Sequence, residues 1–502
     1  MSDDVIRERV RQMALRERIV SPEQAAGLVG NGMRIATGGS LSSGYPIAFF
    51  KALSERSDLS DSFRVDIWSG APLGPEIDGK LVEAGMMRRR LCHQANPTMA
   101  KAINRGDILY ADMGPYIFAN QVRYGFLGHL DLAVIEAIEI TKDGHLVPST
   151  CVSDCATLAR EAERVVVEIN EELPLEMKGI HDIVVPENPP ERRSIPINSP
   201  GDRVGTPYIP MGPEKIAGII ISREPSRPIP REGTSQESEQ IAEHLISFLE
   251  VEVSKGRMPK NLLPLQTGLG SIGEAILKGL GTSNFENLQT FSALLSDSVL
   301  DLIDMGKITC ASGTGLYFSS EGFGRFYDGI KKYKEVIVLR PVDISTYPEL
   351  IQRLGVIALN GAVEVDMYGH VNSSHIGGGR VITGVAGSIE YARNGYLSIF
   401  MTTSTGKGGD ISRIVPMVTH VDHTEHDVQV IVTEQGIADL RGLDPRERAL
   451  EIINRCAHPD YRALLLEYFE RAKSETGGHE PQILDDAFCF HQHLRDKGSM
   501  KG

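Results

Sequence analysis

Three glycines lie between a strand pattern and a helix pattern near the middle of the chain. The run Gln266-Thr-Gly-Leu-Gly-Ser-Ile-Gly-Glu-Ala-Ile276 places Gly268, Gly270 and Gly273 in the turn. Such a turn exposes backbone N–H groups at a helix N-terminus, where they can bind a phosphate or stabilise an oxyanion. The spacing does not match a dinucleotide-binding fingerprint, because no strand ending in an acid follows at the right distance. A simple tight turn is the alternative interpretation.

Carboxylates accompany two further strand patterns. Glu434 directly follows the apolar run 428–433, and ligands of α/β proteins bind at the carboxyl ends of strands. We therefore select Glu434 as a catalytic candidate, with capping of the next helix as its alternative role. Glu364 and Asp366 share one face of a short strand. A pair of this kind either performs acid–base chemistry or accepts hydrogen bonds from nearby loop N–H groups.

Two polar runs are assigned structural roles. The segment His420-Val-Asp-His-Thr-Glu-His426 contains three histidines, but neither helical nor strand spacing arranges them as in a zinc protease. We interpret it as a polar loop before a strand and predict no metal site. The basic run Arg88-Arg89-Arg90 is interpreted as a solvent-exposed helix face.

The elements that must position these residues alternate along the chain. Short β-branched runs alternate with helical patterns, which is typical of an α/β fold with largely parallel sheets. A helix is predicted from Pro22 with Ser21 as its cap, and another over 237–252. The segment 223–235 has three prolines and is the best linker candidate. Strands are predicted at 33–37, 64–68, 131–136, 164–169, 215–222, 288–292, 335–340, 356–360 and 428–433.

The linker predicts two related α/β domains, residues 1–228 and 229–502. Each has a glycine-rich turn after an early strand: Gly38-Gly39-Ser40 in the first and the run beginning at Gly268 in the second.

The composition excludes some classes of function. The 502 residues include 52 Lys and Arg against 67 Asp and Glu, giving a net charge of −15. This acidic balance argues against nucleic-acid and anionic-membrane binding. No apolar run approaches the ~18 residues that span a bilayer. The N-terminus has no apolar signal-peptide core, and the six cysteines are scattered, so we expect a reduced, cytoplasmic protein.

Several unusual runs resemble the acetyl-CoA hydrolase/CoA-transferase family, in particular its long single-chain branch of succinyl-CoA:acetate and propionyl-CoA:succinate CoA-transferases. The resemblance covers nearly the whole chain. It implies two CoA-transferase-type domains with the active site in the cleft between them, and a homodimer. It also implies acyl-CoA and a small carboxylate as substrates, with no permanently bound cofactor. The runs that carry it are 263–270, 353–360, 366–372, 396–400, 420–423, 433–442 and 456–461.

The resemblance fails at the family's nucleophile. In that family a glutamate after an aromatic-Ser pair attacks the thioester, and a glutamyl-CoA thioester then forms. The matching residues here are Phe291-Ser292-Ala293. Alanine has no nucleophile, so double displacement cannot proceed through this position. Ser271, Thr346 and Thr383 stand where typical members carry asparagine, and four changes favour natural divergence over an engineered Glu-to-Ala substitution.

The remaining site residues match the family. The resemblance implies that Glu434 is a second active-site glutamate, that Thr346 borders the acyl pocket, and that Lys407 suits a phosphate of CoA. The positions implied to form the oxyanion and CoA-binding site are Gly268, Leu269, Gly270, Ser271, Ile272, Thr383, Gly387 and Lys407.

These matches favour an acyl-CoA enzyme that performs CoA transfer or thioester hydrolysis without the glutamyl intermediate. In hydrolysis, water would attack the thioester while the turn amides hold the oxyanion and Glu434 acts as general base. Three alternatives stay open: a hydrolase acting on a β-oxo or cyclic acyl-CoA, a catalytically silent acyl-CoA-binding protein, and an engineered Glu-to-Ala variant of a CoA-transferase.

Overall fold

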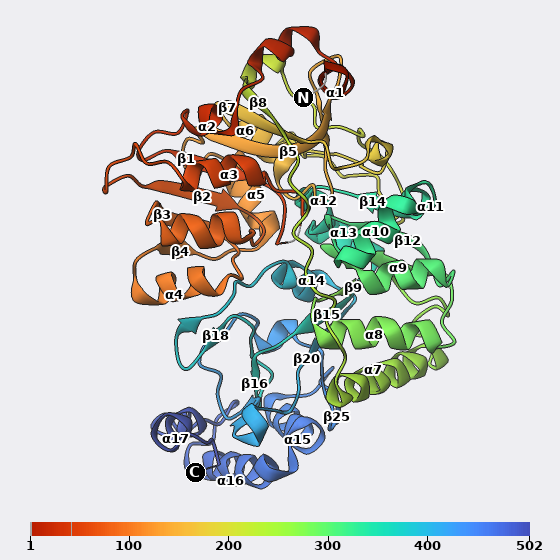
Figure 1. Cartoon of the computed structure of the whole chain (residues 1–502). Helices are drawn as coiled ribbons and strands as arrows, with labels where there is room; N and C mark the ends of the chain where they lie inside the picture. Colours follow the sequence, from red (N-terminus) through yellow and green to blue (C-terminus); the bar gives the residue numbers. More distant parts are fainter. Residues whose placement is uncertain (1–2, 42, 502) are drawn as a thin grey trace. The chain divides into compact units, whose positions relative to one another are not determined.

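Two compact units make up the chain in the computed structural model, which describes residues 3–41 and 43–501 (Figure 1). Unit 1 comprises Met1–Arg231, Gln289–Ile303 and Ile308–Leu350. Unit 2 comprises Glu232–Leu288, Asp304–Lys307 and Ile351–Gly502. The predicted division after residue 228 stays a prediction about domains. The first segment of unit 1 ends at Arg231, close to the predicted boundary. The chain later returns to unit 1 in two further segments.

A largely parallel sheet forms the centre of unit 1, in the order β4-β3-β2-β1-β5-β7-β8. Only β6 (Leu146–Pro148), which pairs with β5, runs antiparallel to its neighbour. Strand β5 is buried along its whole length, as expected for a parallel strand covered on both faces. These strands are β1 (Arg34–Thr37), β2 (Val65–Ser69), β3 (Met87–Cys92), β4 (Leu109–Ala111), β5 (Leu132–Ile140), β7 (Arg164–Asn170) and β8 (Ile216–Ser222).

Helices cover this sheet and bury its apolar side chains. The short helix α2 (Pro22–Ala26) begins as predicted, with the Ser21 hydroxyl accepting the Gln24 N–H group. Helix α3 (Ile47–Ser54) contributes Phe49 and Phe50 to the core. The remaining helices of this part are α1 (Asp3–Arg9), α4 (Pro97–Arg105), α5 (Pro115–Arg123) and α6 (Cys155–Glu161).

The basic run Arg88-Arg89-Arg90 does not form a helix face, so that prediction is wrong. It lies in β3, where successive side chains point to opposite faces. Arg90 is fully buried and donates from Nε to Asp78 over 2.9 Å and from Nη2 to the carbonyls of Ala71 and His93, each over 2.9 Å. A buried carboxylate and buried carbonyls therefore replace the water that the guanidinium loses.

The later segments of unit 1 form a smaller α/β group. Strands β14, β12 and β10 are neighbours in that order, and β12 and β14 are parallel. Strand β11 pairs with β13 in parallel. The strands are β10 (Leu288–Phe291), β11 (Leu294–Ser296), β12 (Ile308–Gly313), β13 (Gly315–Tyr317) and β14 (Ile337–Leu339), and the helices are α9 (Asp297–Asp304), α10 (Ser320–Asp328), α11 (Ile330–Val336), α12 (Val342–Ser345) and α13 (Pro348–Leu354).

Unit 2 has its own run of strands in the order β9-β15-β20-β24-β25. All neighbours in it are parallel except the hairpin of β24 and β25. Helices α7 (Gln236–Ser254) and α8 (Ser271–Thr282) lie side by side (Figure 1). The predicted linker 223–235 has no helix or strand, and α7 confirms the helix predicted over 237–252. The strands are β9 (Leu265–Thr267), β15 (Ile357–Gly361), β20 (Leu397–Met401), β24 (Val430–Thr433) and β25 (Gly436–Asp439).

A second core lies under the C-terminal helices of unit 2. The small sheet of β17 (Val371–Asn372), β16 (Glu364–Asp366) and β23 (Ile414–Val415) packs there with α15 (Pro445–Cys456), α16 (Pro459–Glu475) and α17 (Cys489–Lys497). Both units thus confirm the predicted α/β class with largely parallel sheets. Among the described residues, no helix has the length and apolar character that a membrane span requires.

Candidate active site

The glycine turn, residues 268–273, connects β9 to α8 as predicted. Gly270 has φ +111° and ψ 172°, a conformation open almost only to glycine. A Cβ on Gly273 would lie 2.2 Å from the Gly268 carbonyl oxygen, so this position also requires glycine. The turn takes the backbone from the strand directly into the helix, whose first N–H groups have no acceptor within the helix.

The turn forms one wall of a cavity of about 230 Å³, which we name the turn cavity. Leu359 and Gly361 of β15 line it beside the turn, and Thr402, Thr403 and Arg413 complete its polar wall. Helix-terminal amides next to two hydroxyls and a guanidinium suit an anion or a developing oxyanion. The interpretation as a simple tight turn does not account for this surface.

Glu434 occupies the two-residue turn between β24 and β25, at the carboxyl end of a parallel strand. Its carboxylate accepts the Ser404 N–H group over 2.7 Å, the Ser404 hydroxyl, and the Gln435 side-chain amide over 3.1 Å. The alternative role as a helix cap is wrong, because the next element is a strand. Three donors hold the carboxylate in one orientation.

Glu434 lines a second cavity, of about 310 Å³. Thr403 lines both this cavity and the turn cavity, so the two lie next to each other in unit 2. Gln435 and His458 provide further polar atoms in its wall. The structure therefore places the predicted glutamate beside the predicted oxyanion site.

Three other predicted positions also lie in unit 2. Thr383 is half-buried, and its N–H group donates to the Ser374 carbonyl over 3.3 Å. Gly387 is buried at the start of α14 (Ser388–Asn394). Lys407 is exposed, with φ +50°. None of the three lines the turn cavity or the cavity around Glu434.

Ala293 and Thr346 belong to unit 1. Ala293 is half-buried in the bend between β10 and β11, where its carbonyl accepts the Thr314 N–H group over 2.6 Å. Thr346 is fully buried after α12, and its hydroxyl donates to the Val342 carbonyl over 2.6 Å. Position 293 thus lies two residues after the end of β10.

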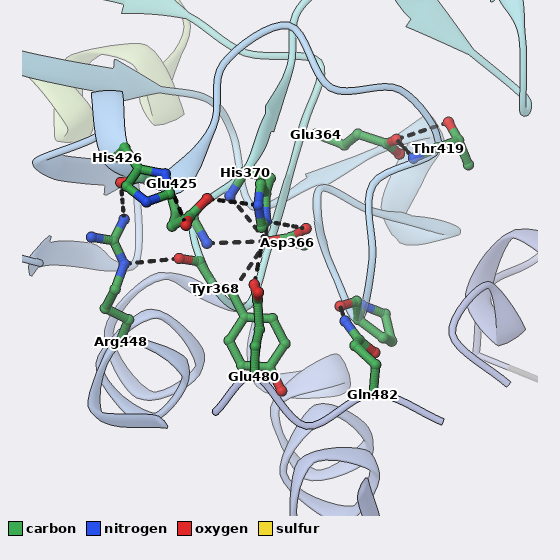
Figure 2. Close-up of polar contacts among 12 residues, drawn as sticks. Glu364, Asp366, Tyr368, His370, Thr419, Glu425, His426, Arg448, Glu480 and Gln482 are labelled. Atoms are coloured by element: carbon green, nitrogen blue, oxygen red, sulfur yellow. Dashed lines mark hydrogen bonds and ion pairs between the residues drawn. The ribbon is translucent and has the colours of Figure 1, made fainter. Parts of the chain in front are cut away.

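The paired acids of β16 are committed to structural hydrogen bonds (Figure 2). Asp366 accepts the N–H groups of Tyr368, Gly369 and His370, each over 3.0 Å. Glu364 accepts the Thr419 N–H group and the Asn372 amide, each over 2.9 Å, and pairs with His491. Bonding to adjacent loop N–H groups, one of the two roles considered for this pair, is confirmed.

The histidines of the run 420–426 face different partners. His420 contacts Asp422 over 3.2 Å, buried His423 contacts the Ser388 hydroxyl over 3.2 Å, and His426 contacts Glu425 over 2.9 Å. The run has no strand and no α-helix. It ends in a short 3-10 turn and precedes β24. This confirms the polar-loop interpretation.

Sequence reasoning missed Ser404 and Arg413. Ser404 provides two of the three hydrogen bonds that hold the Glu434 carboxylate, and Arg413 is a charged residue of the turn cavity. Both lie within six residues of the predicted CoA contact Lys407, and that proximity is the signal that could have found them. Nothing in that spacing indicates which cavity either residue lines.

The whole chain matches known proteins. Residues 4–221 fit the model of the acetyl-CoA hydrolase/transferase N-terminal domain, and residues 322–469 fit that of the C-terminal domain. The chain belongs to the acetyl-CoA hydrolase/transferase family. It is 46% identical to the succinyl-CoA:acetate CoA-transferase of Clostridium kluyveri, over 99% of this chain and 93% of that one. It is 41% identical to the acetyl-CoA hydrolase of Schizosaccharomyces pombe, over 99% of both chains.

Solved structures show the same fold for this family member. RipA from Yersinia pestis matches with a TM-score of 0.69 and 21% identity, over 91% of this chain and 97% of that one. A 4-hydroxybutyrate CoA-transferase from Porphyromonas gingivalis matches with a TM-score of 0.63 and 20% identity, over 91% and 98%. The protein is therefore an enzyme of this family with the expected α/β fold.

Proposed function

We propose that this family member is an acyl-CoA thioester hydrolase that works without a covalent glutamyl intermediate. The observation that carries the proposal is the glycine turn with its cavity beside the fixed carboxylate of Glu434, while position 293 has only a methyl group. The family supplies the substrate class, because its named members act on CoA thioesters.

In this reaction, water attacks the thioester carbonyl carbon and Glu434 accepts the proton of that water. Amides of the glycine turn stabilise the oxyanion of the tetrahedral intermediate. When the intermediate collapses, the C–S bond breaks and the proton passes to the departing thiolate. The products are a carboxylic acid and CoA. Ser404 keeps the Glu434 carboxylate pointing in one direction throughout.

The roles of the other predicted residues form part of the same proposal. Exposed Lys407 contacts a phosphate of CoA as a point charge. Thr383 and Gly387 contribute to CoA binding, and Thr346 borders the acyl group. No permanently bound cofactor is required, because hydrolysis needs only water and the groups named.

The test measures thiol release and acyl exchange with acetyl-, propionyl- and succinyl-CoA, each with and without acetate. We expect the natural sequence to release thiol without exchange and Ala293→Glu to gain exchange. Ala293→Gln is the matched control, since it has the same shape and no nucleophile. Glu434→Gln should reduce thiol release about 100-fold or more, within the usual range for a general base.

Other outcomes contradict the proposal. Tight CoA binding with no turnover of any thioester would identify a silent acyl-CoA-binding protein. Exchange by the natural sequence would identify a transferase with another nucleophile.

We also propose that the enzyme is a cytoplasmic homodimer. The dimer is proposed by analogy with the family. All six cysteines are free, which supports a reducing compartment. Light scattering after gel filtration tests the dimer, and fractionation of the source cell tests the location.

A further inference from the structure

The two neighbouring cavities of unit 2 have different walls. Every residue that lines the cavity around Glu434 has a side chain that forms hydrogen bonds, including the amides of Gln236 and Gln240 and the ring of His458. The turn cavity also has apolar side chains in its wall: Leu269, Ile272, Ile276, Leu359 and Met401. Water therefore favours the cavity around Glu434, whereas an acyl chain favours the turn cavity.

The cavity around Glu434 has room for several water molecules. Its volume of about 310 Å³ is roughly ten times the ~30 Å³ that one water occupies in the liquid. An ordered water needs two to four polar partners, and the amides, hydroxyls and carboxylates of this wall offer both donors and acceptors. Two of the lining groups are the carboxylates of Glu237 and Glu434, so this cavity suits neutral water better than an anion.

Thr403 lines both cavities and stands beside the groups that hold Glu434. It lies two residues after the end of β20 and directly before Ser404. Its hydroxyl donates to the Thr405 carbonyl over 2.8 Å. That bond uses the only proton of the hydroxyl, so the oxygen is left as an acceptor. A water next to Thr403 can therefore donate a proton to this oxygen.

A water with both protons held in this way is a well-oriented nucleophile. One proton points to the Thr403 oxygen and the other to the Glu434 carboxylate, so a lone pair remains for the thioester carbon. Holding the nucleophile in the attacking geometry lowers the barrier, because the orientation is fixed before the reaction starts.

We propose that Thr403 is a water-positioning residue, past which water from the cavity around Glu434 reaches the thioester. The inference rests on the proposed function, which places the thioester at the glycine turn and the base at Glu434. The water oxygen forms the new C–O bond while Glu434 takes one of its protons. The C–S bond then breaks, and that proton passes from Glu434 to the departing thiolate.

The experiment measures thiol release by the full chain with acetyl-, propionyl- and succinyl-CoA. Thr403→Val removes the hydroxyl at nearly constant volume, so kcat should fall about 20-fold while KM changes less than about 2-fold. Thr403→Ser keeps the hydroxyl and should retain at least about a third of the natural kcat. Isothermal titration with CoA should give the same Kd for the natural sequence and both variants.

A second comparison uses Ala293→Glu, because acyl exchange through a glutamyl intermediate consumes no water. Adding Thr403→Val to Ala293→Glu should lower hydrolysis about 20-fold and change exchange less than about 2-fold. An equal fall of both reactions would overturn the inference, since it would show that the variant disturbs Glu434 or the turn cavity.

Thr476→Val is the matched control. The Thr476 hydroxyl also donates to a main-chain carbonyl over 2.8 Å, that of Ala472, and Thr476 lines neither cavity. This variant should release thiol at the natural rate. A natural kcat in Thr403→Val, or an equal loss in Thr403→Val and Thr403→Ser, would also overturn the inference.

The design separates this inference from the proposed function. Thiol release that Thr403→Val does not reduce would overturn the inference and leave the hydrolase intact. No thiol release by the natural sequence from any of the three thioesters would overturn the hydrolase and the role of Thr403 with it. If Thr403→Val does not fold, Thr403→Ala replaces it, because the smaller side chain removes the same hydroxyl without adding any atom.

Discussion

The two glycine-rich turns of this protein follow early parallel strands in both units and have opposite surroundings. In unit 1, a Cβ on Gly38 would lie 2.2 Å from the Cys155 sulfur, and one on Gly39 would lie 2.5 Å from the Gly44 carbonyl oxygen. In unit 2, the nearest atoms to a Cβ on Gly268 or Gly270 are 3.5 Å and 3.7 Å away. The first turn uses glycine for close packing throughout, whereas the second needs it for close packing only at Gly273 and leaves Gly268 and Gly270 in an open wall of the turn cavity.

Two arginines, one in each unit, also differ in their surroundings. Arg90 in unit 1 is enclosed by an aspartate and several carbonyls, whereas Arg413 in unit 2 keeps a buried Nε without a partner. Similar residue types therefore meet different surroundings at these positions of the two units.

The largest effect should be the difference in stability loss between Arg90→Met and Arg413→Met. Arg90→Met leaves Asp78 buried without its partner, so we expect a loss of about 3–5 kcal/mol in the free energy of unfolding. Arg413→Met removes a poorly satisfied buried charge and should change that free energy by less than about 1 kcal/mol. Urea unfolding measures both.

Arg89→Met is the control for strand β3, because Arg89 is exposed on the same strand. It should stay within about 0.5 kcal/mol of the natural sequence. Equal losses in Arg90→Met and Arg413→Met would end the distinction between the two units.

A smaller effect should separate the glycines. Gly39→Ala and Gly270→Ala both place a side chain at positive φ, +96° and +111°. Only Gly39→Ala also brings the added methyl group into steric overlap with neighbouring atoms. We therefore expect the free energy of unfolding to fall by about 3 kcal/mol in Gly39→Ala and by about 1–2 kcal/mol in Gly270→Ala. Denaturant midpoints provide the measurement, and similar midpoints in the two variants would mean that unit 1 accommodates the added methyl group.

The smallest effect concerns the pH dependence of stability. The titratable groups of the two units lose their contributions to stability over different pH ranges. Burial raises the pKa of Glu136 and Glu168 in unit 1 to about 7, from an ordinary value of 4.5. A carboxyl group whose pKa is higher in the folded state stabilises that state while it is protonated. Its contribution to the free energy of unfolding is therefore complete below pH 4.5 and is lost as the pH rises through 7.

In unit 2 the group is His370, which contacts Asp366 over 3.1 Å and Glu425 over 2.8 Å, with Glu480 at 3.7 Å (Figure 2). Burial alone lowers its pKa, but the hydrogen bond and charge of Asp366 and the charges of Glu480 and Glu425 outweigh burial and raise the pKa to about 9. The stabilisation is therefore complete below pH 6.5 and lost as the pH rises through 9.

His370→Gln should reduce the free energy of unfolding by about 1–2 kcal/mol at pH 6, an amount discounted for partial solvent screening. The difference should disappear by pH 10. Exposed His426→Gln is the control and should leave the pH profile unchanged. A His370→Gln difference that is constant from pH 6 to pH 10 would show that His370 acts through packing rather than charge.

The sequence was sufficient for the α/β class, for the longer strands of the two parallel sheets and for the family, because these depend on local periodicity and on long unusual runs. Ser21, Gly270 and Glu434 could be placed at the ends of elements from the sequence, since caps, turns and strand ends have local signals. The paired acids at Glu364 and Asp366 were left with two possible roles because their partners come from distant segments.

Only the tertiary structure decided what each polar group meets. Local sequence made Arg88 to Arg90 look solvent-exposed, and this holds for the first two. Arg90 is buried because it pairs with Asp78, twelve residues away in the chain. Ser404 reaches Glu434 across thirty residues, and Arg413 joins the glycine turn from a different part of unit 2. Periodicity reports which face of an element is apolar, whereas desolvation and hydrogen bonding depend on neighbours that folding brings together.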